Sequence, residues 1–136
     1  MRPLRLYQIL SLFDDAIKSP CLRKNDDSIY RSIVYIRTHV GKKIALHQLA
    51  QIAGLSDYYF SRLFKEMTGF SPTEFVINTR IDQAKVLLTS TSLSILEISK
   101  QVGYPNSSNL ITHFIRRVGM SPTQYRKNMT NQSSMS

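Results

Sequence analysis

The chain contains the same sequence pattern twice. Gly54 of the first copy recurs as Gly103, 49 residues later, whereas Phe64 recurs as Phe114, 50 residues later, so the second copy holds one inserted residue. The matching positions are Leu46, Leu49, Ala50, Gly54, Phe64, Gly69, Ser71, Pro72, Thr73 and Phe75 in the first copy, and Ile95, Ile98, Ser99, Gly103, Phe114, Gly119, Ser121, Pro122, Thr123 and Tyr125 in the second. Such a period is typical of stacked units, but two copies are too few for a solenoid. The duplication predicts two similar units that bind one repetitive ligand.

Composition narrows the kind of ligand. The 136 residues suffice for one domain or two very small ones, and an apolar content of 42% argues against disorder. Lys and Arg total 18 against 9 Asp and Glu, which gives a net charge of +9. This excess favours an anionic partner, with nucleic acid ahead of a membrane surface.

The sequence also indicates a compartment. The single cysteine, Cys21, cannot form an internal disulfide, which fits a reducing environment. No apolar run approaches the roughly 20 residues that a membrane-spanning helix needs. Polar residues interrupt the apolar ones near the N-terminus, so the segment does not have the pattern of a signal peptide. We therefore expect a soluble, cytoplasmic protein.

The spacing of apolar residues predicts an all-α fold. An amphipathic N-terminal helix is expected from Leu4 to about Lys18, followed by a linker up to residue 25. Its apolar positions are Leu6, Ile9, Leu10, Phe13 and Ile17. A second helix is expected to begin at Asp26 or Asp27 and to end at Gly41. Its core-facing positions are Ile29, Ile33, Ile36 and Val40.

Each copy of the pattern has the signals of a helix-turn-helix, which needs a small residue in its first helix, a glycine in the turn and apolar residues in its second helix. These are Ala50, Gly54, Phe60 and Leu63 in the first copy, and Ser99, Gly103, Leu110 and Phe114 in the second. The first unit is expected at about 45–68 and the second at about 94–118. Ser71 and Pro72 predict the start of a long connecting helix over 72–88. The matching Ser121 and Pro122 open a short terminal helix, and we expect residues 129–136 to be a disordered tail.

Two such units in tandem resemble the DNA-binding domain of the AraC/XylS family of bacterial transcription regulators. The resemblance is carried by LHQLAQIAGLSDYYFSRLFKEMTGFSPTEF and ILEISKQVGYPNSSNLITHFIRRVGMSPTQYRK, and it covers about Ser28 to Lys127. It implies a DNA-binding domain over 26–128, in which two recognition helices enter successive major-groove segments of double-stranded DNA. It also implies action at the bacterial nucleoid, RNA polymerase as a partner, and activation rather than repression.

The resemblance assigns roles to individual residues. Positions expected to read bases are Tyr58, Ser61, Arg62, Ser107, Ser108, Asn109, Ile111 and Thr112. Positions expected to contact phosphates are Lys65, Ser71, Arg116 and Ser121. Arg62 suits a bidentate contact to guanine, Asn109 suits adenine, and Ile111 offers only apolar contact, for instance to a thymine methyl. Plainer roles stay open: Tyr58 as cover for the turn, Ser107 and Ser108 as helix-start residues.

The second unit departs from the family pattern. Thr112 stands where Arg is usual, Ile115 where Lys is usual, and Asn109-Leu110 where Tyr-Phe is common. We therefore expect base reading by the second unit to be weaker. In the first unit Ala45 stands where a capping Ser is common, which costs about 1 kcal/mol of local stability.

The sequence gives little support to other functions. His39, His47 and His113 have no metal-ligand spacing, so we expect no metal site and no cofactor. No catalytic pattern is present, so we expect no enzyme. The rival hypotheses are a non-specific basic DNA coat, and an interaction protein that binds a regulator through the N-terminal helix. That helix is expected either to pack on its own domain, as we prefer, or to mediate self-association or contact with a protein partner.

Overall fold

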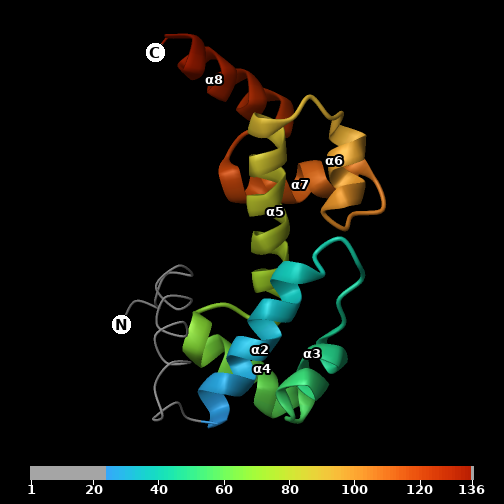
Figure 1. Cartoon of the computed structure of the whole chain (residues 1–136), viewed down its shortest axis with the longest axis vertical. Helices are drawn as coiled ribbons and strands as arrows, with labels where there is room; N and C mark the ends of the chain where they lie inside the picture. Colours follow the sequence, from blue (N-terminus) through green and yellow to red (C-terminus); the bar gives the residue numbers. More distant parts are fainter. Residues whose placement is uncertain (1–23, 136) are drawn as a thin grey trace. The chain divides into compact units, whose positions relative to one another are not determined.

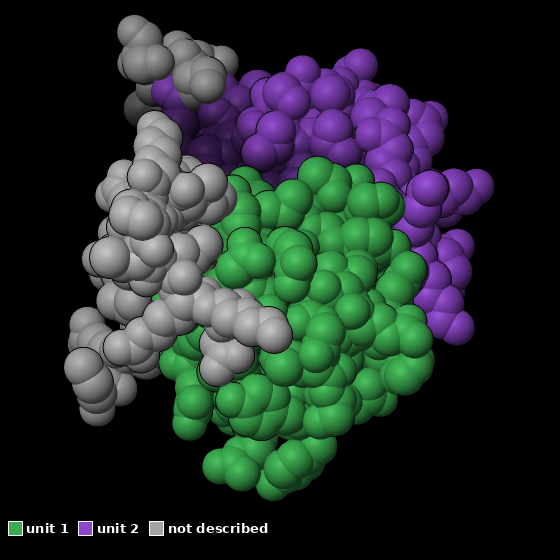
Figure 2. Space-filling view, turned by 60° about the horizontal axis from the view of Figure 1, so that its bottom comes forward, with its two compact units in different colours: residues 1–39, 44–76 green, residues 40–43, 77–136 purple. Residues whose placement is uncertain are grey.

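The computed structural model describes residues 24–135, and all the regular secondary structure in this part of the chain is α-helix (Figure 1). The expected N-terminal helix and Cys21 lie outside the described residues. The helices are α2 (Lys24–Thr38), α3 (Leu46–Ala53), α4 (Asp57–Thr68), α5 (Pro72–Ser90), α6 (Ile95–Gln101), α7 (Ser107–Val118) and α8 (Pro122–Met135). They form two compact units, coloured separately in Figure 2. The main division falls within α5, between Val76 and Ile77, and the segment Val40–Lys43, which follows α2, belongs to the second unit. The all-α fold expected from the sequence is confirmed for the described residues.

The first unit has its own hydrophobic core. Helix α2 contacts α3 and α4, and its inward residues Ile29, Ile33 and Ile36 are completely buried, as their helical spacing predicts. Helix α3 ends at Gly54, whose φ of 73° is left-handed, and Ser56 caps α4 by accepting from the Tyr59 amide at 3.3 Å. Ala45 makes no side-chain cap at the start of α3, as expected.

The second unit repeats this arrangement. Ser94 caps α6 by accepting from the Glu97 amide at 3.1 Å, and Asn106 caps α7 by accepting from the Asn109 amide at 3.0 Å. The core residues are Ile81, Ala84, Leu88, Ile98, Val102, Tyr104, Leu110 and Phe114. The turn from α6 to α7 is longer than the turn from α3 to α4. It holds Tyr104, which is only 5% exposed.

The duplication extends to the aromatic packing. In the first unit the rings of Phe64 and Phe75 meet edge to face, with their centroids 5.2 Å apart. In the second unit the matching rings of Phe114 and Tyr125 meet in the same way at 5.5 Å. Edge-to-face geometry is favourable because the positive ring edge meets the negative ring face. Each contact fixes the end of a helix-turn-helix against the helix that follows it.

Helix α8 extends to Met135, into the region over 129–136 for which the sequence predicts a disordered tail. Polar composition suggests disorder, yet it does not prevent a helix that already has a capped start from continuing. The Ser121 hydroxyl accepts from the Gln124 amide at 3.1 Å, and the Gln124 side chain donates to Asn128 at 3.1 Å, one turn further on. The connecting helix also ends two residues later than expected, at Ser90, and α2 begins slightly earlier, at Lys24.

Candidate nucleic-acid interface

Helix α4 has a buried side and an exposed side. Phe60 and Phe64, one turn apart, are completely buried in the core of the first unit. Since successive residues are about 100° apart around a helix, Tyr58 and Arg62 lie on the opposite side. Tyr58 is 72% exposed, which is unusual for a large aromatic side chain, and Arg62 is also exposed. The two phenylalanines therefore fix the rotation of α4 so that this polar side faces outward.

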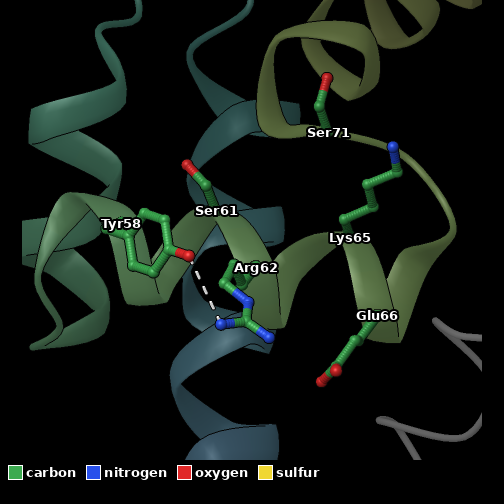
Figure 3. Close-up of a pocket in the computed structure, with 6 residues that line it drawn as sticks. All are labelled: Tyr58, Ser61, Arg62, Lys65, Glu66 and Ser71. Carbon is green, nitrogen blue, oxygen red and sulfur yellow. Dashed lines mark hydrogen bonds between the residues drawn. The ribbon is translucent and has the colours of Figure 1, made fainter.

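The exposed side of α4 and the start of α5 border a shallow hollow of roughly 420 Å³ (Figure 3). Its lining residues are Tyr58, Ser61, Arg62, Lys65, Glu66 and Ser71. All but Glu66 are predicted from the sequence to contact DNA, and the structure brings them together on one surface. In Figure 3 Lys65 extends to the same side as Ser71, whereas Glu66 extends away from them. The sequence reasoning missed Glu66, although its position one turn after Arg62 indicates the same helix face.

Tyr58 supports the side chain of Arg62. The central carbon of the guanidinium lies 5.6 Å from the centroid of the Tyr58 ring, within the range of a cation–π contact. The same guanidinium donates a long hydrogen bond of 3.5 Å from Nη1 to the Tyr58 hydroxyl. These contacts restrict the guanidinium while leaving it at the surface. A guanidinium held in this way retains donors for the planar, two-point contact that a base edge or phosphate accepts.

The start of α5 is held against the end of α4. The hydroxyl of the buried Thr68 donates to the Phe64 carbonyl at 2.8 Å and accepts from the Phe70 amide at 3.1 Å. Gly69 takes a φ of 84°, which reverses the chain, and the Ser71 hydroxyl then accepts from the Glu74 amide at 3.2 Å. The first turn of α5 consequently lies beside Lys65, with the positive end of a helix dipole directed to this surface.

Helix α7 presents the corresponding surface in the second unit. Leu110 and Phe114 are completely buried, whereas Ser108, Asn109 and Thr112 are exposed. Ser107 and Ile111 are half-buried. Of the residues predicted to read bases, Ser108, Asn109 and Thr112 therefore lie on the outer side of α7, and Ile111 lies at its edge. Ser107 precedes Leu110 by three residues and Phe114 by seven, so it lies on the core side of the helix. Arg116 is exposed on the same helix, and Ser121 caps α8 as Ser71 caps α5.

The second unit contains a polar network of Tyr104, His113 and Arg80 that the sequence does not indicate. The Tyr104 hydroxyl and His113 Nδ1 lie 2.7 Å apart, and the Arg80 guanidinium lies 5.4 Å from the centre of the Tyr104 ring. Burial lowers the pKa of His113, and the positive charges of Arg117, Arg116 and Arg80 lower it further. Burial also raises the pKa of Tyr104, so its hydroxyl stays protonated beside the imidazole. This network joins the long turn to α5 and α7.

Other polar side chains in the second unit also have structural contacts. Arg116 and Arg117 are both exposed, and Arg117 Nε donates to Asn78 on α5 at 2.7 Å, so this arginine also stabilises the unit. Arg126 donates to the carbonyls of Leu88 and Thr91 at the end of α5, at 3.0 and 3.3 Å. Neither role is evident from residue spacing, because the partners lie far apart in the chain.

Among residues 24–135, no three His, Cys, Asp or Glu side chains come together as a metal site would require. Over the same range, no helix combines the length and the apolar character that crossing a bilayer requires.

Known proteins match both the sequence and the fold. A family profile described as a helix-turn-helix domain matches residues 49–128. YobQ of Bacillus subtilis, an uncharacterised HTH-type transcriptional regulator, is 31% identical over 100 residues, which are 74% of this chain and 42% of YobQ. Btr of the same bacterium, an HTH-type transcriptional activator, is 38% identical over 101 residues, which are 73% of this chain and 19% of Btr. The DNA-binding domain of AdpA, crystallised with a target DNA, is similar with a TM-score of 0.75 at 27% identity, over 79% of this chain and 97% of that domain.

Two helix-turn-helix units in tandem, each with an exposed second helix, define the class of helix-turn-helix transcription regulators. Within this class the chain belongs to the AraC/XylS family, as the sequence resemblance predicts. It spans less than half of the length of YobQ and of Btr.

Proposed function

We propose that this chain binds double-stranded DNA sequence-specifically and regulates transcription, with α4 and α7 entering successive segments of the major groove. The observation that carries the proposal is the exposed side of α4, where Arg62, Lys65 and the start of α5 border one hollow. A guanidinium supported by Tyr58 suits the O6 and N7 atoms of guanine. An ammonium group and a helix start suit phosphates, which position the protein without specifying sequence.

Helix α7 is the second reading element of the proposal. Ser108, Asn109 and Thr112 supply hydrogen-bonding groups on its outer side, Ile111 lies at the edge of that side, and Ser107 begins the helix on its core side. Arg116 and the Ser121 helix start supply phosphate contacts. Neighbouring major-groove segments on one side of B-DNA are about 34 Å apart. The structure of AdpA with a target DNA supports double-stranded DNA as the ligand.

The first experiment selects bound sites from random duplex DNA and compares their affinity with shuffled duplexes. We expect selected sites to bind at least a thousandfold more tightly than shuffled ones, and binding to weaken steeply between about 50 and 200 mM salt. Equal affinity for selected and shuffled duplexes would leave a non-specific DNA coat as the better hypothesis. No binding to any duplex would refute the proposal as a whole.

We further propose that the regulator activates transcription at the nucleoid, with RNA polymerase as its partner. Support comes from Btr, which is described as an activator. The test is transcription in vitro from a promoter that carries a selected site just upstream, with and without the protein. Increased transcript supports activation, whereas decreased transcript indicates repression. A role of the N-terminal segment in self-association is tested separately, by light scattering of the intact chain.

A further inference from the structure

The outer sides of α4 and α7 differ in chemistry although they are copies of one pattern. With the 50-residue offset that relates Phe64 to Phe114, the position of Ser61 is taken by Ile111 and the position of Lys65 by Ile115. The position of Arg62 is taken by Thr112. One side of the outer surface of α7 is therefore apolar where the matching side of α4 is polar and cationic.

Ile111 and Ile115 lie together on α7. They are one turn apart, so their side chains are neighbours on the helix surface. Ile115 is 46% exposed and Ile111 is half-buried. The buried Leu110 and Phe114 fix the rotation of α7, so the two isoleucines lie between the core side and the outermost residues Ser108 and Thr112. Ile115 is therefore not part of the hydrophobic core of the second unit.

We propose that Ile111 and Ile115 form an apolar strip that contacts thymine methyl groups, and that Ile115 determines the preference of the second unit for thymine. This inference rests on the proposed DNA binding by α7. The C5-methyl of thymine is the apolar group that the bases of B-DNA display in the major groove. Against a guanine or cytosine edge the same side chains would cover hydrogen-bonding groups without satisfying them, which is unfavourable.

The neighbours of the strip favour DNA over a protein partner. Ser108 and Thr112 are exposed next to it, and the exposed Arg116 lies on the far side of Thr112. Hydroxyl groups beside an apolar strip can bond to base edges while the strip covers a methyl, and Arg116 can reach a phosphate. Because the strip carries no charge, it adds nothing to the salt dependence of binding, so its contribution can be measured apart from the electrostatic one.

The test uses the full chain and one selected duplex. Each thymine in turn is replaced by deoxyuridine, which removes only the methyl group. We expect at least one replacement to weaken binding about fourfold, the effect of exposing one buried methyl-sized group. Ile115→Ala should bind the parent duplex more weakly and should lose this sensitivity at the same thymine. The control Leu96→Ala removes a side chain of similar exposure, 47%, from α6 of the same unit, and should keep the parental response to deoxyuridine.

Each outcome has one meaning, provided that circular dichroism shows both variants to be folded. If no deoxyuridine replacement matters, or if Ile115→Ala responds to every replacement as the parent does, the thymine-contact proposal is overturned while DNA binding stands. If Leu96→Ala loses the sensitivity as well, the effect is a general one of the second unit, and the proposal is overturned too. If the intact chain binds no selected duplex, the proposed function itself fails.

Discussion

Gly103 is the position at which one added methyl group should disturb the second unit most. Its φ is 96°, a left-handed conformation that residues with a Cβ rarely adopt. A Cβ placed on this glycine would overlap the carbonyl oxygen of Val40 and lie 3.0 Å from Arg80 Nε. The Arg80 side chain can move slightly, but the Val40 oxygen belongs to the backbone. Gly103→Ala therefore combines conformational strain with a clash that the unit can relieve only by moving a chain segment.

Gly119 offers a matched control in the same unit. Its φ is 89°, and a Cβ placed on it would meet nothing within 4 Å. Gly119→Ala should cost about 1–2 kcal/mol from the left-handed conformation alone, partly offset by a stiffer unfolded chain. Gly103→Ala should cost the same strain plus about 1–3 kcal/mol for overpacking. We expect the free energy of unfolding to fall by about 1–3 kcal/mol more for Gly103→Ala than for Gly119→Ala.

Urea denaturation followed by circular dichroism measures the difference. With a slope of about 1–3 kcal/mol per molar urea, the two variants should have clearly separate midpoints. The parent chain and both variants are compared under one set of conditions, so that the slope itself can be checked. Equal midpoints for Gly103→Ala and Gly119→Ala would show that the Val40 backbone does not approach Gly103 as the structure indicates.

Three further predictions concern binding, pH and the connecting helix. Arg62→Ala should weaken DNA binding by about 1–3 kcal/mol and relax the preference at one base pair. Tyr58→Ala should cost less binding free energy when Arg62 is already absent, which a double-mutant cycle measures, and additive effects of the two substitutions would contradict the supporting role of Tyr58. The pKa of His113 is lower in the folded chain than its ordinary value of 6.5, so its neutral ring contributes fully to the free energy of unfolding above about pH 6.5, and this contribution is lost as the pH falls. His113→Gln should therefore reduce the pH dependence of the free energy of unfolding below about pH 6.5, and an unchanged dependence would refute this. Ala84→Pro should lower the free energy of unfolding by about 3 kcal/mol or more, followed by circular dichroism, and should shorten the footprint on DNA. A folded variant with the parental footprint and affinity would mean that the units do not need a rigid connection.

The sequence predicts much of the fold because its signals are local. Ser56, Ser94 and Asn106 cap the helices that follow them, and Gly54 ends α3 with a left-handed φ. Such features depend on a few neighbouring residues, so spacing reveals them. The rotation of α4 also follows from spacing, since Phe60 and Phe64 must be buried. For this reason the predicted residues of the first unit lie together around one hollow.

Other features depend on residues that are far apart in the chain. The contact between Arg80 and Tyr104 and the bond from Arg117 to Asn78 join separate helices, and no local pattern indicates them. The apolar character of a residue does not by itself predict its burial, because Val86 lies within α5 yet is 61% exposed. The length of α8 is not evident from composition either, since its polar residues resemble those of a disordered tail.

The division of the core within α5 has a consequence for the life of the protein in the cell. Phe75 and Val76 belong to one hydrophobic cluster, and Ile81, Ala84 and Leu88 of the same helix belong to another. Segments with separate cores can open at different free energies, so loss of one core need not abolish the other. A substitution that weakens the second core should then leave the first core folded while it exposes apolar residues of the second to proteases. Under the proposed function, we expect such damage to lower the amount of protein before it alters which DNA sites are bound.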